Sequence, residues 1–339
     1  MTNRDILAIG TSAGGVEALL SLARSFAPDF PAAVLVTLHI APHFHSSFDN
    51  VLSNAGPLPA KFAADGERAA RGTIYLAPPD RHLLMTADDR LRLGTGPREN
   101  NSRPAIDAML RSVAACCGSR AVGAVLTGTL GDGASGLFSI GACGGITVVQ
   151  DPHDAAYPEM PINALRRLQP EHVVPLADMP ALFDRLVQEP AGPPEPASTD
   201  TVMEVNVAKG AHIPMHEMDR IGRRSLFACP DCNGVMWEIE EGHLRRYRCH
   251  VGHAYTAELM SLAFDESLRR ALAIALRSLE ERVALARKLQ TDAESRQQSH
   301  AAATWSERAV EFQQELDVIR QVVGRMDEIA ARQPQQDKH

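Results

Sequence analysis

The sequence has no apolar run that approaches the roughly 20 residues of a membrane-spanning helix, and its N-terminus lacks the pattern of a secretory signal peptide. It also has only six cysteines in 339 residues, which is not a disulfide framework. Three of them, Cys116, Cys117 and Cys143, lie among small apolar residues and are expected to be buried. These absences argue against membrane insertion and against a secreted disulfide scaffold, so we expect a cytoplasmic protein.

An excess of positive charge is absent as well. Lys and Arg number 34 against 42 Asp and Glu, and the formal net charge is −8 at pH 7. This balance gives no electrostatic reason to expect nucleic acid or an anionic membrane surface as a partner. With 45% hydrophobic and 22% charged residues, the composition is that of a globular protein, and the length allows one to three domains.

From residue 6 to about residue 185, short apolar runs alternate with helix-length amphipathic segments. The short runs are apolar throughout rather than at every second residue, which is typical of strands buried on both faces of a parallel sheet. We therefore predict an α/β fold, a doubly wound, mostly parallel sheet of the Rossmann-like three-layer kind. The predicted strands are 6–10, 32–40, 72–78, 121–128 and 144–150, the predicted helices are 16–26, 46–55, 103–117 and 134–143, and 83–94 is predicted as a hairpin.

The pattern changes in the C-terminal half. A stretch rich in Pro, Ala, Ser and Thr over 188–201 ends the alternation, and 188–224 is predicted to be a linker. A small cysteine-bearing β module is predicted at 225–256, and two long helices at 257–333. Residues 1–187 would then form the α/β domain and fold by themselves.

Three predicted strands are followed at their carboxyl ends by residues that can perform hydrolysis. Ser12 follows the first strand, His39 lies at the end of the second, and Asp132 follows the strand at 121–128. Because the carboxyl ends of parallel strands meet at one edge of a sheet, these residues can converge as nucleophile, base and orienting carboxylate. Each also has a structural alternative: Ser12 as a helix N-cap, and the other two as strand-end and turn residues.

The glycine-rich turn around Ser12 has a competing interpretation as a phosphate-binding loop. The sequence lacks the Gly-Lys-Ser/Thr ending of a P-loop and the full G-x-G-x-x-G spacing, and His39 stands where a dinucleotide fold carries an acidic ribose ligand. We therefore favour Ser12 as a nucleophile. Backbone N–H groups of the glycine-rich turns could stabilise an oxyanion, with Ala13, Gly14, Thr129 and Leu130 as candidates.

Six blocks of sequence support this interpretation: "IGTSAGGVEAL", "LHIAPHFHSSF", "DGERAARGTIYLAPPDRHL", "NNSRPAIDAMLRSVA", "AVLTGTLGDGASGL" and "VVQDPHDAAYPEMPINAL". Together, over residues 4–185, they resemble the catalytic domain of the CheB-type chemotaxis protein-glutamate methylesterases. The resemblance implies a doubly wound α/β domain with a Ser–His–Asp triad at Ser12, His39 and Asp132 and no catalytic cofactor. It also implies hydrolysis of glutamate γ-methyl esters on chemoreceptor-type protein helices, or deamidation of receptor glutamines by the same triad.

The sequence departs from that family in two turns and in its domain composition. Ala13 stands where the family commonly has threonine, and 128–133 reads Gly-Thr-Leu-Gly-Asp-Gly in place of Gly-Met-Gly-x-Asp-Gly. The family usually carries an N-terminal phosphoacceptor receiver domain, whereas here the first catalytic strand begins within ten residues. We therefore expect a stand-alone form that phosphorylation in cis does not control.

The remaining cysteines have metal-ligand spacing. Cys229 and Cys232 form a C-x2-C pair, Cys249 follows after sixteen residues, and His253 lies four residues beyond it. This spacing is typical of a zinc ribbon, and four protein ligands leave no open position, so we predict a structural zinc ion. His250 is a competing candidate for the fourth ligand. Reduced cysteines without a bound metal are an alternative to the zinc site, and binding of nucleic acid by the ribbon is an alternative to a purely structural role.

The two predicted C-terminal helices carry apolar residues at alternating spacings of three and four, from Leu272 to Val283 in the first and from Trp305 to Met326 in the second. Such helices form an antiparallel hairpin or a coiled-coil dimer. Self-association or binding of a signalling partner is therefore an alternative to simple packing of the hairpin. A weakly catalytic signalling scaffold, acting through the ribbon and these helices, is the alternative to an enzyme.

Overall fold

The computed structural model describes residues 3–39, 47–241 and 244–332, and the chain divides into two compact units. The first unit runs to Met260 and the second begins at Ser261. The first contains every candidate site residue, and the second is a pair of long helices. None of the helices in the described ranges is both long and apolar enough to cross a membrane.

The larger sheet of the first unit has the doubly wound topology that the sequence predicts. Its neighbouring strands all pair in parallel, in the order β3-β4-β2-β1-β7-β8-β9. From the central β1 the chain adds β2, the edge strand β3 and then β4 on one side, and it crosses back to add β7, β8 and β9 on the other. The strands are β1 (Ile6–Thr11), β2 (Ala33–Leu38), β3 (Ala60–Phe62), β4 (Ile74–Leu76), β7 (Ala121–Val125), β8 (Ile146–Gln150) and β9 (His172–Val174).

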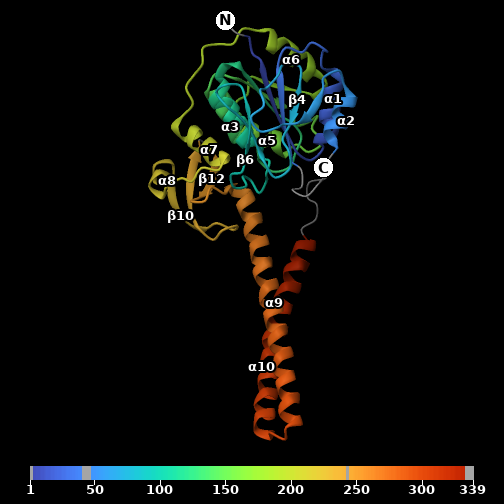
Figure 1. Ribbon diagram of the computed structural model, residues 1–339, viewed down its shortest axis with the longest axis vertical. Helices are drawn as coiled ribbons and strands as arrows, with labels where there is room; N and C mark the ends of the chain where they lie inside the picture. Colours follow the sequence, from blue (N-terminus) through green and yellow to red (C-terminus); the bar gives the residue numbers. More distant parts are fainter. Residues whose placement is uncertain (1–2, 40–46, 242–243, 333–339) are drawn as a thin grey trace. The chain divides into compact units, whose positions relative to one another are not determined.

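Helices cover both faces of this sheet, with α3 on one side of the strands and α1 and α2 on the other (Figure 1). Successive side chains of β1 point to opposite faces, so Ile6 and Ala8 lie in one core while Leu7 and Ile9 lie in the other. This explains why the strand is an unbroken apolar run. One core is closed by α3 (Ile106–Cys117), α4 (Ala134–Ala142) and α5 (Glu159–Arg167), and the other by α1 (Gly15–Ser25), α2 (Phe48–Ala55) and α6 (Met179–Gln188).

The observed elements differ from the predicted ones in length and number. The strand predicted at 32–40 ends at Leu38, so His39 lies just beyond it. Strands β3 and β9 and helices α5 and α6 were not predicted, and the two strands have only three residues each. The hairpin predicted at 83–94 is formed by β5 (His82–Met85) and β6 (Leu91–Gly94). The predicted ends at Ile40, Ser46 and Gln333 lie outside the described residues.

The stretch predicted as a linker, 188–224, contains two helices. Helix α7 (Thr199–Lys209) begins after Ser198, whose side chain accepts a hydrogen bond from the N–H of Thr201, and α8 (Met215–Ile221) follows. Helix α7 buries Glu204 and Val207. The predicted linker therefore needs correction, because α7 and α8 belong to the first compact unit. The sequence did not indicate α7, because a charged residue occupies one of its buried positions and the residues before it have the composition of a linker.

A second sheet follows, with strands paired antiparallel in the order β10-β11-β12-β13. Its strands are β10 (Arg223–Ala228), β11 (Val235–Glu241), β12 (Leu244–Cys249) and β13 (Ala254–Thr256). Cys229 directly follows β10, Cys249 ends β12, and His253 directly precedes β13, so these residues lie at strand ends.

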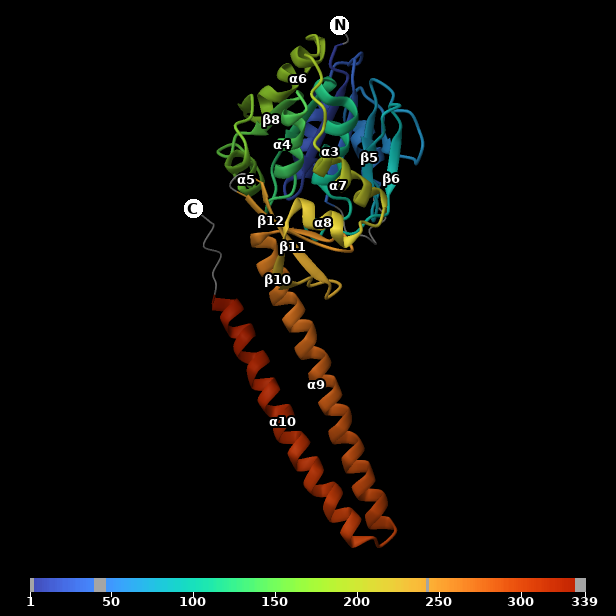
Figure 2. The same cartoon turned by 90° about the vertical axis from the view of Figure 1, so that its left-hand side faces the viewer.

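The second unit is the predicted helical hairpin. Helices α9 (Ala257–Ser295) and α10 (Ser299–Arg332) run side by side (Figure 2). Glu280 pairs with Arg320, and Arg282 pairs with Glu315, so positions rise along one helix as they fall along the other. The helices are therefore antiparallel, and Leu316 is buried by this packing.

Candidate functional site

Ser12 lies in the tight turn between β1 and α1. Its N–H donates to the carbonyl of Thr127 after β7, and its own carbonyl accepts from the N–H of Gly15. Gly14 has a φ of 73°, and a Cβ there would lie 3.1 Å from Thr127 Oγ1, so the turn requires glycine. Gly14 is the N-cap of α1 and no side chain caps the helix, which answers the alternative that Ser12 is a capping residue.

His39 joins Ser12 to Asp132. Its Nδ1 lies 3.1 Å from Ser12 Oγ, and its Nε2 lies 2.8 Å from Asp132 Oδ2. An ionised carboxylate can only accept hydrogen bonds, so the ring proton is assigned to Nε2. Nδ1 is then left as the acceptor that faces the serine hydroxyl. The structure thus brings together the three residues that the sequence placed at three strand ends.

Asp132 is 2% exposed and is held by donors on all sides. Burial alone would raise its pKa, but the hydrogen bond and charge of His39, with further bonds from Asn100 and Ile106, lower the pKa to about 2. The carboxylate is therefore ionised near neutral pH. Besides His39, its donors are Ile106 N at 2.6 Å, Asn100 Nδ2 at 2.9 Å, Gly133 N at 3.0 Å and Asp107 N at 3.1 Å.

Two residues of this site had no role in the sequence-based prediction. Asp107 is 1% exposed and accepts the N–H groups of Gly133 and Gly136 at 3.0 and 2.7 Å. Asn100 Nδ2 donates both to Asp132 and to Asp107 Oδ2, at 2.9 and 3.0 Å. Burial and the charge of Asp132 raise the pKa of Asp107 to about 7. Both residues lie in the block "NNSRPAIDAMLRSVA", but nothing in their spacing marks them as partners of Asp132.

The four backbone groups predicted to stabilise an oxyanion differ in availability. The N–H of Leu130 already donates to Glu159 Oε2 at 2.7 Å, and Leu130 has a φ of 68°. The N–H groups of Ala13, Gly14 and Thr129 have no hydrogen-bond partner within the described ranges. These three remain candidates, whereas Leu130 would first have to release Glu159.

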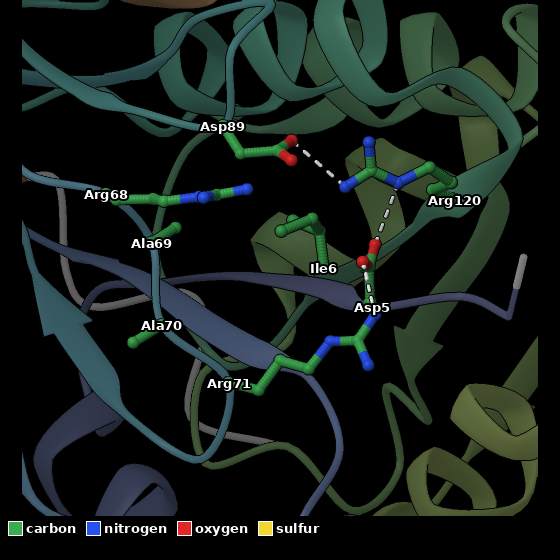
Figure 3. Close-up of a pocket in the computed structure, with 8 residues that line it drawn as sticks. All are labelled: Asp5, Ile6, Arg68, Ala69, Ala70, Arg71, Asp89 and Arg120. Atoms are coloured by element: carbon green, nitrogen blue, oxygen red, sulfur yellow. Dashed lines mark hydrogen bonds and ion pairs between the residues drawn. The ribbon is translucent and has the colours of Figure 1, made fainter.

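A cavity of about 400 Å³ lies at the opposite, amino-terminal edge of the sheet, where β1 and β7 begin (Figure 3). In it Asp5 lies between Arg71 and Arg120, with N–O distances of 3.0 and 2.9 Å, and Asp89 pairs with Arg120 at 3.0 Å. The ion pairs join the start of β1 to the β5–β6 turn. Because the cavity lies at the far edge from Ser12, we do not assign it to the hydrolytic site.

Cys229, Cys232, Cys249 and His253 come together in the module, with their ligand atoms all within 4.8 Å of one another. Cys232 Sγ lies 3.7 Å from Cys249 Sγ, and His253 Nδ1 lies 3.5 Å from Cys249 Sγ. A tetrahedral zinc ion with Zn–S distances of about 2.3 Å separates its ligands by roughly 3.8 Å, so this donor set can hold a metal ion of that kind.

The competing ligand His250 is not part of this group. Its ring packs against the backbone of Gly234, where an added Cβ would lie 2.1 Å from His250 Cε1. His253 Nε2 faces Asp231 Oδ2 at 3.9 Å, so the remaining ring nitrogen of the candidate ligand has a carboxylate neighbour, as metal-bound histidines usually do.

Comparisons with known proteins agree with the geometry of the first unit. The protein-glutamate methylesterase/protein-glutamine glutaminase 2 of Methanosarcina mazei is 37% identical over 183 residues, 52% of this chain and 50% of the relative. A protein-glutamate methylesterase/protein-glutamine glutaminase of Yersinia pestis is 38% identical over 168 residues, 49% of this chain and 48% of the relative. The chain thus spans about half the length of the curated relatives it matches.

The crystal structure of the Thermotoga maritima CheB methylesterase catalytic domain is also similar. It has a TM-score of 0.53 and 30% sequence identity, and the likeness covers 55% of this chain and all of that one. The family model described as CheB methylesterase matches residues 7–183, just over half of the 339 residues and the whole region that carries Ser12, His39 and Asp132. The chain belongs to the CheB methylesterase family.

Proposed function

We propose that this chain is a hydrolase that cleaves glutamate γ-methyl esters of chemoreceptor-type signalling proteins through an acyl-enzyme on Ser12. The observation that carries the proposal is the continuous path from Ser12 Oγ through both ring nitrogens of His39 to Asp132, with steps of 3.1 and 2.8 Å. Family membership and the activity named for the relatives identify ester cleavage as the chemistry that such a path serves.

The reaction begins with attack of Ser12 Oγ on the ester carbonyl while His39 Nδ1 takes the hydroxyl proton. Asp132 holds the ring and stabilises the imidazolium through Nε2. Collapse of the tetrahedral intermediate expels methanol, which takes the proton from Nδ1, and leaves a glutamyl ester on Ser12. Water then attacks this ester with the same proton transfers, releasing the glutamate side chain and restoring the serine.

The developing oxyanion would be stabilised by backbone N–H groups near the nucleophile. Ala13, Gly14 and Thr129 lack protein partners within the described ranges, and groups of this kind each contribute a few kcal/mol to transition-state stabilisation. Ala13 offers only its backbone, which fits such a role regardless of its departure from the threonine common in the family.

Deamidation of glutamine is a second candidate activity for the same site. The matched relatives carry both activities in their names. The same attack on a carboxamide would expel ammonia instead of methanol and reach the same acyl-enzyme. The substrates of both reactions would be side chains on receptor helices in the cytoplasm.

The cysteine module would hold one structural zinc ion. Three thiolates and one imidazole fill a tetrahedral coordination shell and leave no position for water or substrate, so the metal would stabilise the fold and take no part in ester cleavage.

Methanol release from methyl-labelled receptor membranes, with the purified full-length chain, tests the proposal. Ser12→Ala is expected to reduce release by about 10⁴-fold or more while the circular dichroism spectrum is unchanged, because only the nucleophile is removed. Ser25→Ala, at an exposed position of α1, is the matched control and should retain full activity. Near-normal methanol release by folded Ser12→Ala protein would exclude the mechanism. If the native chain released no methanol, the alternative of a signalling scaffold without esterase activity would be favoured.

A further inference from the structure

The loop between β6 and α3 connects the candidate triad to the cysteine module. Asn100 and Asn101 both have positive φ values, 50° and 61°, in the left-handed region that asparagine adopts more readily than most residues other than glycine. Asn100 is 6% exposed, and its amide nitrogen bridges the two buried carboxylates of Asp132 and Asp107 by donating a hydrogen bond to each. The position of this one side chain therefore depends on what fixes the loop.

The module fixes the loop through main-chain hydrogen bonds. The N–H of Asn100 donates to the carbonyl of Ala254 at 2.8 Å, and the N–H of Ala254 donates to the carbonyl of Arg98 at 3.4 Å. These contacts form a parallel bridge between the loop and the start of β13. Ala254 directly follows His253, the histidine of the four-residue cluster. The path from that cluster to Asp132 Oδ1 thus passes through one residue of the module and one of the loop.

A buried group of charges holds the same two segments together. Glu99, adjacent to Asn100, pairs with Arg111 of α3 and with Arg248 of β12. Glu204 of α7 pairs with Arg111 at 3.2 Å, Arg248 at 3.1 Å and Arg246 at 3.0 Å. These five side chains are at most 4% exposed, so water cannot replace a missing partner. Docking of the module is therefore tightly linked to the conformation of the loop.

Arg248 also reaches the cysteine cluster itself. Its Nη1 donates to the carbonyl of Gly252 at 2.9 Å, in the turn between Cys249 and His253. Two residues after Ala254 on β13, Thr256 packs against Gly131, the residue before Asp132: its Cγ2 would lie 3.5 Å from a Cβ added to that glycine. The turn that carries two of the four cluster residues thus lies among the contacts that hold Glu99 and Asn100.

We propose that the cysteine module is a positioning element of the hydrolytic site: metal held by its four ligands keeps Ala254 and Arg248 in place, and these hold Asn100 against Asp132. Asn100 is then a positioning residue that acts through the aspartate and touches no substrate. Loss of the metal would loosen 229–256 first and, through Ala254, the loop at 98–102. This inference rests on the proposed function only where it concerns the rate of hydrolysis.

Hydrogen exchange of the full-length chain tests the coupling without any substrate. Zinc-loaded and chelator-treated protein are compared, together with Cys232→Ser and the matched control Cys116→Ser, a half-buried cysteine outside the cluster. We expect chelation and Cys232→Ser to speed exchange in both 229–256 and 98–107 while the amides of β1 and β7 stay protected, and zinc to reverse the effect of chelation. Unchanged exchange at 98–107, with 229–256 loosened, would overturn the proposal.

Kinetics of Asn100→Ala provide the second arm. Because Asn100 orients the aspartate and lies away from substrate, kcat should fall by about 100-fold with little change in KM. Asn101→Gly, at the exposed neighbouring position, is the control and should behave like the native chain. An unchanged kcat for Asn100→Ala would overturn the positioning role. If chelation unfolds the whole first unit, the exchange experiment is uninformative and these kinetics alone test the proposal. A native chain with no esterase activity would refute the proposed function but leave the exchange result valid.

Discussion

At the scale of single residues, opposing contributions determine the charge of Asp132. A carboxylate that is 2% exposed would ordinarily favour its neutral form, yet donors from α3, Asn100 and His39 keep it ionised. The N-terminus of α3 contributes the N–H groups of Ile106 and Asp107, which point at the carboxylate as they would at any anion there. Asp132 can therefore hold the imidazole ring without accepting its proton.

Asp132→Asn is expected to keep the fold and reduce methanol release by about 10⁴-fold. The amide can contact His39 Nε2, but it favours the wrong tautomer and cannot stabilise an imidazolium. The rate of ester cleavage across pH 6–9 is the measurement. Asp151→Asn is the control, since the Asp151 carboxylate accepts the N–H of His153 within its own turn. Equal rates for Asp132→Asn and the native chain would exclude a catalytic role for Asp132 and leave it with a structural role in its turn.

The lowered pKa of Asp132 also predicts how stability depends on acid. The folded value of about 2 lies below the ordinary value of 3.8, so ionised Asp132 contributes stability above pH 4 that is lost as the pH falls towards 2. The loss amounts to about 2 kcal/mol. Urea unfolding between pH 4.5 and pH 2 should show this slope in the native chain and a smaller one in Asp132→Asn. Asp107 has the opposite effect on the free energy of unfolding: because its pKa is raised to about 7, its ionisation lowers stability as the pH rises from 4 to 7.

At the scale of secondary-structure elements, some of the site could be predicted and some could not. Ser12, His39 and Asp132 follow strands β1, β2 and β7, whose unbroken apolar runs are visible in the sequence, and parallel pairing brings their ends together. Asn100 and Asp107 have no such signal, because their roles depend on the loop conformation and on the burial of α3. From the sequence, Glu204 would be expected at the surface, and only the structure shows that it is buried between Arg111 and Arg248.

For the cysteine module, too, the sequence predicts one part of the structure and not another. The spacing of Cys229, Cys232, Cys249 and His253 is sufficient to predict the cluster, since short loops between antiparallel strands bring such residues together. The docking of the module on the α/β domain could not be predicted, because it depends on charges from three separate segments.

Metal analysis of the native chain, purified without chelators, is expected to find about one zinc per chain. Cys249→Ala removes a central ligand and should lower the zinc content to near zero, whereas Cys143→Ala, a buried cysteine of the α/β core, should leave it unchanged. Elemental analysis of both variants is the measurement. Native protein without zinc, or Cys249→Ala protein that retains it, would contradict the assignment of the ligands.

At the scale of the whole molecule, the boundary between compact units falls after Met260, while the sequence places the end of the α/β domain near residue 187. The difference lies in α7, whose Glu204 pairs with Arg111 of α3, and in the β10–β13 module, whose Arg246 and Arg248 pair with the same glutamate. Leu84, Ala105 and Ala108 of the α/β domain form one apolar cluster with Ala208 of α7. A chain that ends at residue 187 lacks Ala208. It keeps the ion pair between Glu99 and Arg111 but lacks Glu204 and Arg248, which pair with these two residues in the longer chain.

Two fragments separate these boundaries. Residues 1–260 should fold cooperatively and release methanol at a rate close to that of the full chain, because they retain the triad, the loop at 98–102 and the module that holds it. Residues 1–187 should melt several degrees lower and cleave the ester more slowly. Glu99 and Arg111 would still pair there, but in water, where such a pair contributes about 1 kcal/mol or less, and Asn100 would lose the carbonyl of Ala254. Thermal unfolding and methanol release of the two fragments are the measurements, and a 1–187 fragment as stable and as active as 1–260 would show that the α/β domain needs no support from the module.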